Sequence, residues 1–96
     1  MAPVPLSDLS VFQRFQDGGW ALNDAKTALS RSFRFDDFKQ AFAFVTRVAE
    51  LAEDIDHHPD IAISYNRVRL TLTSHDAKGL TRRDLRFLEK FEMLAG

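Results

Sequence analysis

Residues 59–73 read PDIAISYNRVRLTLT, and their apolar side chains recur at every second position. This alternation is typical of two β-strands that each turn one face toward a core and the other toward solvent. Asn66 lies at the expected turn, so the stretch predicts an antiparallel hairpin. Pro59 cannot continue a helix and therefore separates the hairpin from what precedes it. The alternating apolar residues are Ile61, Ile63 and Tyr65, then Val68, Leu70 and Leu72.

A long helix is predicted before the hairpin, from a cap at Asp36 or Asp37 to about Ile55. Its apolar residues form two neighbouring stripes, a wider sector than a helix that covers a sheet needs. We expect the first stripe to face the core; the second indicates either a subunit contact or deeper burial within one chain. The first stripe is Phe38, Phe42, Val45, Ala49 and Ala52, and the second is Phe44, Val48, Leu51 and Ile55.

A further helix follows the hairpin and begins near Thr81. Asp84 comes three residues later, which is the spacing of the acidic residue in a capping box. Leu85, Leu88 and Phe91 then recur with helical spacing and are expected to face the core.

The amino-terminal part predicts a short helix and a second hairpin. Ser7 and Asp8 can open the helix, Gly18 and Gly19 end it, and strands over residues 20–22 and 28–35 pair across 23–26. The resulting order is helix, two strands, helix, two strands, helix, within a single domain of residues 1–96. This order predicts an α+β fold in which three helices cover one face of a four-stranded antiparallel sheet.

Length and composition limit the functions that we expect. A chain of 96 residues makes one small domain, so a sizeable site would need a neighbouring subunit. The net charge of −1 gives no overall attraction to nucleic acid or to anionic lipid, and neither is expected as a direct partner. The absence of cysteine excludes disulfides and thiolate nucleophiles. Without a signal-peptide pattern or a membrane-spanning run, the expected location is the cytoplasm.

The three histidines lie close together in the sequence, near several carboxylates. His57 and His58 come just before Pro59, and His75 follows the second strand of the hairpin. Imidazole exchanges protons near neutral pH, so the cluster predicts acid–base chemistry. The return path of the hairpin can bring His75 close to the turn at residues 57–59. Glu53, one helical turn before His57, is placed to orient an imidazole or to remain a solvent-facing charge.

Each candidate also has a plain structural explanation. A histidine near a helix C-terminus can simply offset the helix dipole, and Asp84 is favoured as a cap over a catalyst. Trp20 lines a pocket or fills the core. Arg67 and Arg69 alternate on the polar face of their strand, where they meet an anionic ligand or remain ordinary surface charge. A metal site is disfavoured, because adjacent histidines diverge by about 100° around a helix.

The spacing of these residues resembles the signature of the pterin-4a-carbinolamine dehydratases. The signature runs from Glu53 through the turn at 57–59 and Tyr65 to His75 and Asp84. Ile61 departs from the family, in which many members carry an aromatic residue soon after the turn. The similarity covers nearly the whole chain and includes Gly19-Trp20, Phe33-Arg34-Phe35 with Phe38, Thr46-Arg47-Val48-Ala49, Tyr65-Asn66, Thr73-Ser74-His75 and Gly79-Leu80-Thr81.

The resemblance implies a dehydratase that converts 4a-hydroxytetrahydropterin to quinonoid dihydropterin, recycling the cofactor after an aromatic amino acid hydroxylase has used it. No metal or organic cofactor is implied, and family members assemble as homodimers or homotetramers. His57 and His75 would share the acid–base work, while His58 binds or orients the pterin. The other implied site residues are Glu53 and Trp20 for substrate binding, with Asp84 and Pro59 in support.

The alternative is a non-enzymatic interaction module. Animal relatives double as dimerisation cofactors for a homeodomain transcription factor, and other relatives resemble assembly factors, so the long helix would be the binding surface. Retention of all three histidines favours the enzyme, because a scaffold has no physical need for them.

Overall fold

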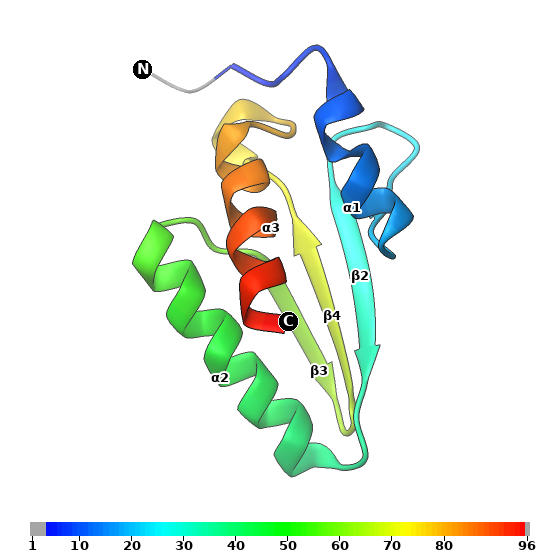
Figure 1. Cartoon of the computed structure of the whole chain (residues 1–96), viewed down its shortest axis with the longest axis vertical. Helices are drawn as coiled ribbons and strands as arrows, with labels where there is room; N and C mark the ends of the chain where they lie inside the picture. The colour runs from blue at the N-terminus through cyan, green and yellow to red at the C-terminus, as the bar shows by residue number, and fades with distance from the viewer. Residues whose placement is uncertain (1–3, 96) are drawn as a thin grey trace.

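A computed structural model describes residues 4–95 as an antiparallel sheet with helices packed on one face (Figure 1). The predicted α+β fold and order of elements are confirmed. No helix within residues 4–95 is long and apolar enough to cross a membrane. The elements are the 3-10 helix η1 (Leu9–Phe12), α1 (Gln13–Asp17), β1 (Ala21–Leu22), β2 (Leu29–Arg34), α2 (Phe38–Ile55), β3 (Asp60–Ser64), β4 (Arg67–Leu72), the 3-10 helix η2 (His75–Ala77) and α3 (Arg82–Ala95).

The four strands lie in the order β1-β2-β4-β3, and all neighbours are antiparallel. Both predicted hairpins are present. They are joined by β2 and β4, which pair from Leu29 opposite Leu72 to Arg34 opposite Arg67. Two hydrogen bonds between Asn66 and Phe35 close this end of the sheet. The side-chain amide of Asn66 donates to the backbone carbonyl of Phe35 at 3.0 Å, and the backbone carbonyl of Asn66 accepts from the Phe35 N–H at 2.8 Å.

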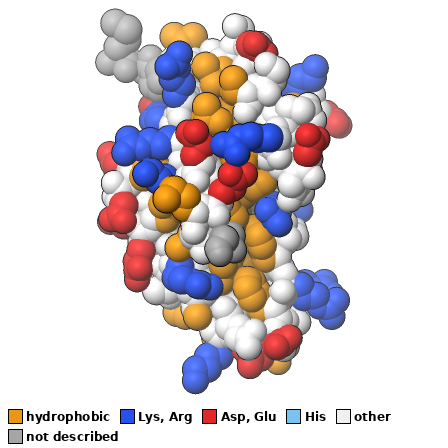
Figure 2. Space-filling view, viewed as in Figure 1, with side chains coloured by type: hydrophobic (Ala, Val, Ile, Leu, Met, Phe, Trp, Pro, Cys, Tyr) orange, Lys and Arg blue, Asp and Glu red, His pale blue; other side chains and the backbone are white. Residues whose placement is uncertain are grey.

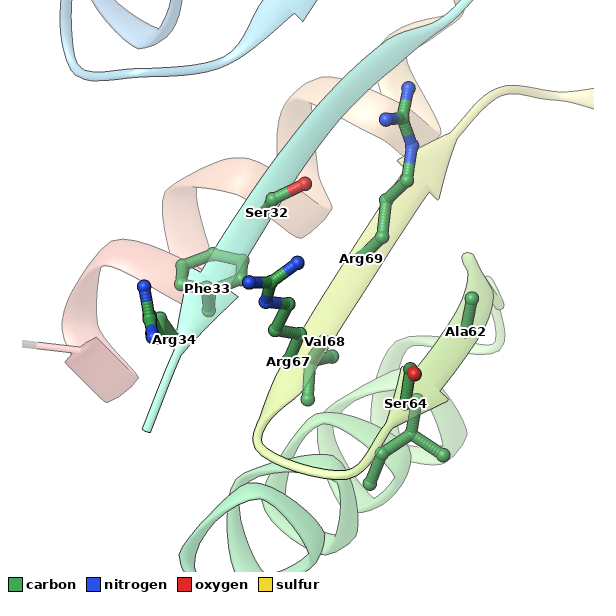
Figure 3. Close-up of a pocket in the computed structure, with 9 residues that line it drawn as sticks. Ser32, Phe33, Arg34, Ala62, Ser64, Arg67, Val68 and Arg69 are labelled. Atoms are coloured by element: carbon green, nitrogen blue, oxygen red, sulfur yellow. The ribbon is translucent and has the colours of Figure 1, made fainter. Parts of the chain in front are cut away.

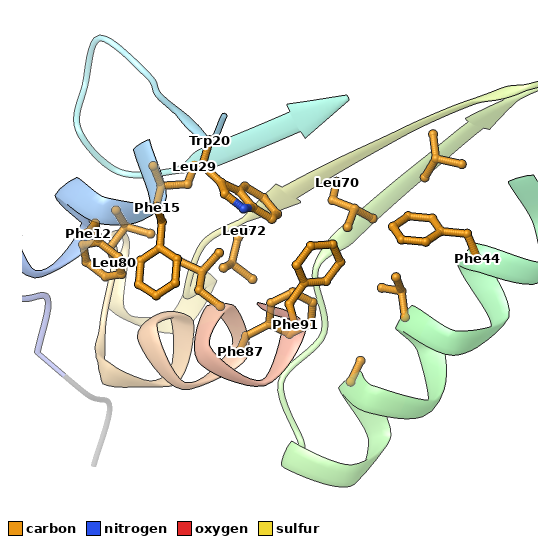
Figure 4. Packing of buried hydrophobic residues seen from close by; sticks show 14 of the residues in the cluster. Phe12, Phe15, Trp20, Leu29, Phe44, Leu70, Leu72, Leu80, Phe87 and Phe91 are labelled. Carbon is orange, nitrogen blue, oxygen red and sulfur yellow. The ribbon is translucent and has the colours of Figure 1, made fainter. Parts of the chain in front are cut away.

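The core lies between the sheet and the helices, and aromatic rings from several elements fill it (Figure 4). Val68, Leu70 and Leu72 project from β4 into this layer, as the alternation predicts, and all are at most 1% exposed. From α3 it receives Phe87, Leu88 and Phe91. The open face of the sheet is therefore left to the polar residues of the same strands.

The prediction that the first stripe of α2 faces the core was wrong for its two phenylalanines, although Ala52 of the same stripe is buried. Phe44 and Val48, from the second stripe, are buried, whereas Phe38 and Phe42, from the first, are 48% and 53% exposed. Both stripes repeat with the same period, so periodicity alone does not choose between them. Ala41, which is fully buried, belongs to the face that meets the sheet and lets the helix approach closely.

This assignment can be tested with two phenylalanines of the same helix. Phe44→Ala should lower the free energy of unfolding by about 3–5 kcal/mol, because it empties a buried aromatic site. Phe42→Ala should cost about 0.5 kcal/mol or less, as exposed substitutions usually do. Urea unfolding in dilute solution, where subunit association contributes least, measures both values. Equal losses would contradict the orientation of α2.

Candidate active site

The two neighbouring histidines that follow α2 differ in burial. Asp56 adopts the left-handed conformation with φ of 53°, and the His57 N–H donates to the carbonyl of Ala52 at 3.0 Å. With the Asp56 N–H donating to Glu53, these bonds form the Schellman ending of a helix. The chain turns so sharply that His57 is buried at 8% exposure, whereas His58 remains exposed.

His57 points to Asp84, a carboxylate with no exposed surface. The His57 Nε2 lies 2.6 Å from Asp84 Oδ1. The second oxygen, Oδ2, accepts from the Ser74 hydroxyl at 2.8 Å and from the Thr81 N–H at 2.9 Å. The predicted capping box at the start of α3 is confirmed by the Thr81 bond. Asp84 is thus a helix cap and the partner of a histidine at once.

His75 reaches the same region from β4. Ser74 pairs with Gly79, so residues 74–79 form a small closed loop that carries His75 at its start. The His75 Nε2 lies 3.6 Å from Oδ1 of Asp60, the residue that follows Pro59. This contact confirms the expected approach of His75 to the turn at 57–59. His75 is 72% exposed and Asp60 65%, so their pair lies at the surface.

The third histidine also meets a carboxylate. His58 Nε2 is hydrogen-bonded to Oε2 of Glu53, and both side chains are exposed. Glu53 therefore contacts an imidazole, the first of its two predicted alternatives, while it remains exposed to solvent; the ring is that of His58 and not that of His57. Every histidine of the chain is paired through Nε2 with a carboxylate.

Two of the remaining predicted site residues lie inside the protein. Pro59, the last residue of the turn at 57–59, is buried. Trp20 is 4% exposed and packs edge to face against Phe33 and Phe91, at centroid distances of 6.5 and 5.8 Å. These contacts support the core-filling role of Trp20 over substrate binding. Among residues 4–95, no three His, Cys, Asp or Glu side chains gather as metal ligands.

Sequence reasoning missed Asp60 and Ser74. Asp60 adjoins the turn at 57–59 and follows Pro59 directly, which is the signal that could have identified it. Ser74 continues the inward-facing register of Leu70 and Leu72, so it had to be a buried hydroxyl in need of a partner.

Next to His75, the side chain of Asp76 accepts a hydrogen bond from Arg83, and this bond is the main reason why the pKa of Asp76 is lowered.

Comparison with known proteins identifies similar chains along almost the full length. The family model described as pterin 4 alpha carbinolamine dehydratase matches residues 4–94. A Gloeobacter violaceus protein assigned by inference as a pterin-4-alpha-carbinolamine dehydratase is 62% identical over 68 residues, covering 69% of this chain and 74% of the relative. A Thermomicrobium roseum protein with the same inferred assignment is 47% identical over 91 residues, covering 94% and 96%.

Two solved structures share the fold. A Brucella melitensis structure described as a transcriptional coactivator/pterin dehydratase is 36% identical, with a TM-score of 0.81, and the alignment covers 96% of this chain and 99% of that one. A pterin dehydratase-like protein identified as a RuBisCO assembly factor in the alpha-carboxysome is 25% identical, with a TM-score of 0.66 and coverage of 81% and 90%.

The double role of Asp84 makes a stability prediction. Asp84→Ala should lower the free energy of unfolding by about 3 kcal/mol, because it leaves His57, Ser74 and the Thr81 N–H without their buried acceptor. Asp37→Ala is the matched control, since Asp37 caps α2 through the Gln40 N–H at 2.8 Å at an exposed position. That variant should cost about 1 kcal/mol. Equal losses in urea would show that Asp84 acts only as a cap.

Proposed function

Because this chain belongs to the pterin 4 alpha carbinolamine dehydratase family, we propose that it converts 4a-hydroxytetrahydropterin to quinonoid dihydropterin and water. The observation that carries the proposal is the pairing of every histidine with a carboxylate at one end of the sheet. Such pairs fix the orientation of an imidazole, which a proton-transferring side chain requires.

The reaction needs two proton transfers. An acid protonates the 4a-hydroxyl oxygen, the bond from C4a to oxygen breaks, and water leaves. A base removes the proton from N5, and the electron pair of that N–H bond forms the double bond between N5 and C4a. The products balance the substrate without any oxidant or reductant, so side chains that exchange protons suffice for the chemistry.

We assign the two transfers to His57 and His75, which lie in different environments. His57 is buried against Asp84, while His75 is exposed beside Asp60. One of the two would act as the acid and the other as the base. His58 and Glu53, the exposed pair, are assigned to binding and orienting the pterin. In a cell this activity would recycle a pterin cofactor after an aromatic amino acid hydroxylase.

We further propose that the protein forms a homodimer or homotetramer through α2 and β3. Phe38 and Phe42 lie one turn apart with their ring centroids at 5.8 Å, and each is about half exposed. β3 is an edge strand whose Ile61 and Ile63 are 38% and 37% exposed. Figure 2 shows hydrophobic side chains among charged ones along the middle of the helical face. Apolar surface of this kind and an unpaired strand edge favour a second copy as the partner.

A protein-binding role is the second candidate. Its support is the same exposed face of α2, together with the relative that is described as a RuBisCO assembly factor. The two candidates make different demands on the histidines, because a scaffold needs the apolar face but no proton transfer. Catalytic measurements therefore separate them.

The dehydratase proposal predicts how three histidine variants behave. His57→Ala and His75→Ala should each lower turnover about 10²- to 10⁴-fold, because each removes a proton-transferring group. His58→Ala should mainly raise KM. The measurement follows the decay of 4a-carbinolamine generated in place by a hydroxylase, with spontaneous dehydration as the baseline. Lys90→Ala, an exposed substitution on α3, controls for differences between protein preparations and should retain full activity.

Two results would count against this assignment. Wild-type protein that fails to accelerate the reaction above the baseline would favour the protein-binding candidate. Near-wild-type turnover in both His57→Ala and His75→Ala would remove these residues from the chemistry, provided that circular dichroism shows folded variants.

The assembly proposal predicts that Phe42→Asp dissociates the oligomer, because a buried unpaired charge at a subunit contact is unfavourable. Light scattering at micromolar concentration measures the change in mass. Ala43→Asp is the control, since Ala43 is exposed on a different side of α2 and should leave the mass unchanged. A wild-type protein that is already monomeric would refute the assembly.

A further inference from the structure

Three arginines gather on the open face of the sheet, away from the helices. Arg34 of β2 lies opposite Arg67 of β4, and Arg69 projects from the same face two residues further along. Figure 3 shows the three guanidinium groups along adjacent strands, with α2 and α3 behind the sheet. All three side chains are exposed. Like charges directly opposite each other on neighbouring strands destabilise a sheet.

No carboxylate relieves this repulsion within the described part of the chain. Elsewhere arginines do find carboxylates, since Arg14 pairs with Glu92 at 2.9 Å and Arg83 pairs with Asp76. Arg34, Arg67 and Arg69 form no such ion pair among residues 4–95. The face therefore holds three adjacent positive charges, although the whole chain carries a net charge of −1.

Hydroxyl groups accompany the arginines. Ser32 lies opposite Arg69, and Ser64 of β3 lies opposite Arg67. Arg69 is already oriented, because its Nη2 donates to the Ser30 hydroxyl at 3.1 Å. A depression of about 480 Å³ lies over these strands, which is within the size range of small-molecule sites. Its lining combines the three arginines and Ser32 and Ser64 with the apolar residues Phe33, Ala62, Ile63 and Val68.

We propose that this depression binds the phosphate groups of a small organic polyphosphate. Guanidinium groups bind phosphate through paired N–H donors, and serine hydroxyls donate to the remaining oxygens. An anion between Arg34 and Arg67 would convert their repulsion into two attractive contacts. This binding site is a function additional to the proposed dehydration and does not depend on it.

The arginine site is separate from the histidines. A strand rises about 3.3 Å per residue, so Arg67 lies about 17 Å and Arg69 about 10 Å along β4 from Leu72, where the histidine end of the sheet begins. An acidic residue borders the three arginines, which favours a small ligand over nucleic acid or an acidic protein. Asp60, on the next row of the same face, opposes Thr71 and would repel an extended polyanion.

The test titrates inorganic pyrophosphate and tripolyphosphate into the full-length protein at low ionic strength and follows binding by calorimetry. Arg67→Gln and Arg34→Gln should each weaken binding about tenfold or more, because each removes one guanidinium group with its paired N–H donors. Arg86→Gln, an exposed change on α3, is the matched control and should bind as the wild type does. Dehydratase turnover should be unchanged in all three variants.

Parallel titrations with a polyglutamate peptide and with single-stranded DNA cover the other sources of negative charge. Binding of either one without binding of the polyphosphates would overturn the proposal. The absence of polyphosphate binding would overturn it too, and so would an equal loss in Arg86→Gln, which would indicate unspecific charge attraction. Loss of polyphosphate binding in Arg34→Gln and Arg67→Gln, but not in Arg86→Gln, supports the site.

Discussion

Asp84 has no exposed surface, and both of its oxygens are engaged. Without partners, burial of such a carboxylate would cost several kcal/mol. The partners that offset this cost are His57 after α2, Ser74 after β4 and the Thr81 N–H before α3. Three segments that are distant in the sequence therefore meet at one side chain. The contact that orders the ends of the two main helices is also the contact that orients the buried histidine.

The three histidine–carboxylate pairs differ in burial. The pairs of His58 with Glu53 and of His75 with Asp60 are exposed, and exposed ion pairs add little to stability. Both of these rings are exposed, whereas the ring of His57 is buried against Asp84. The proposed pterin-binding residues His58 and Glu53 thus form an exposed pair, and the proposed catalytic residue His57 belongs to the buried one.

The fold could be predicted because its signals are local. Alternation, caps and turns lie within a few residues of each other, and they locate the strands and helices correctly. The orientation of α2 was missed because its two apolar stripes differ by a rotation that only the sheet decides. Asp60 and Ser74 were missed for a related reason. Their partners, His75 and Asp84, lie 15 and 10 residues away in sequence, and only the paired strands bring them together.

The spacing of the family signature follows from the geometry of the hairpin. The chain leaves the turn at 57–59 along β3 and returns along β4, with Asp60 opposite Thr71. His75 and Asp84 can reach the turn only if the outward and return paths have matching lengths. A shift of one residue in β4 would also exchange the faces, placing Ser74 outside and the His75 ring in the core. The separation of these residues in the sequence is thus the condition under which the strand register assembles the site.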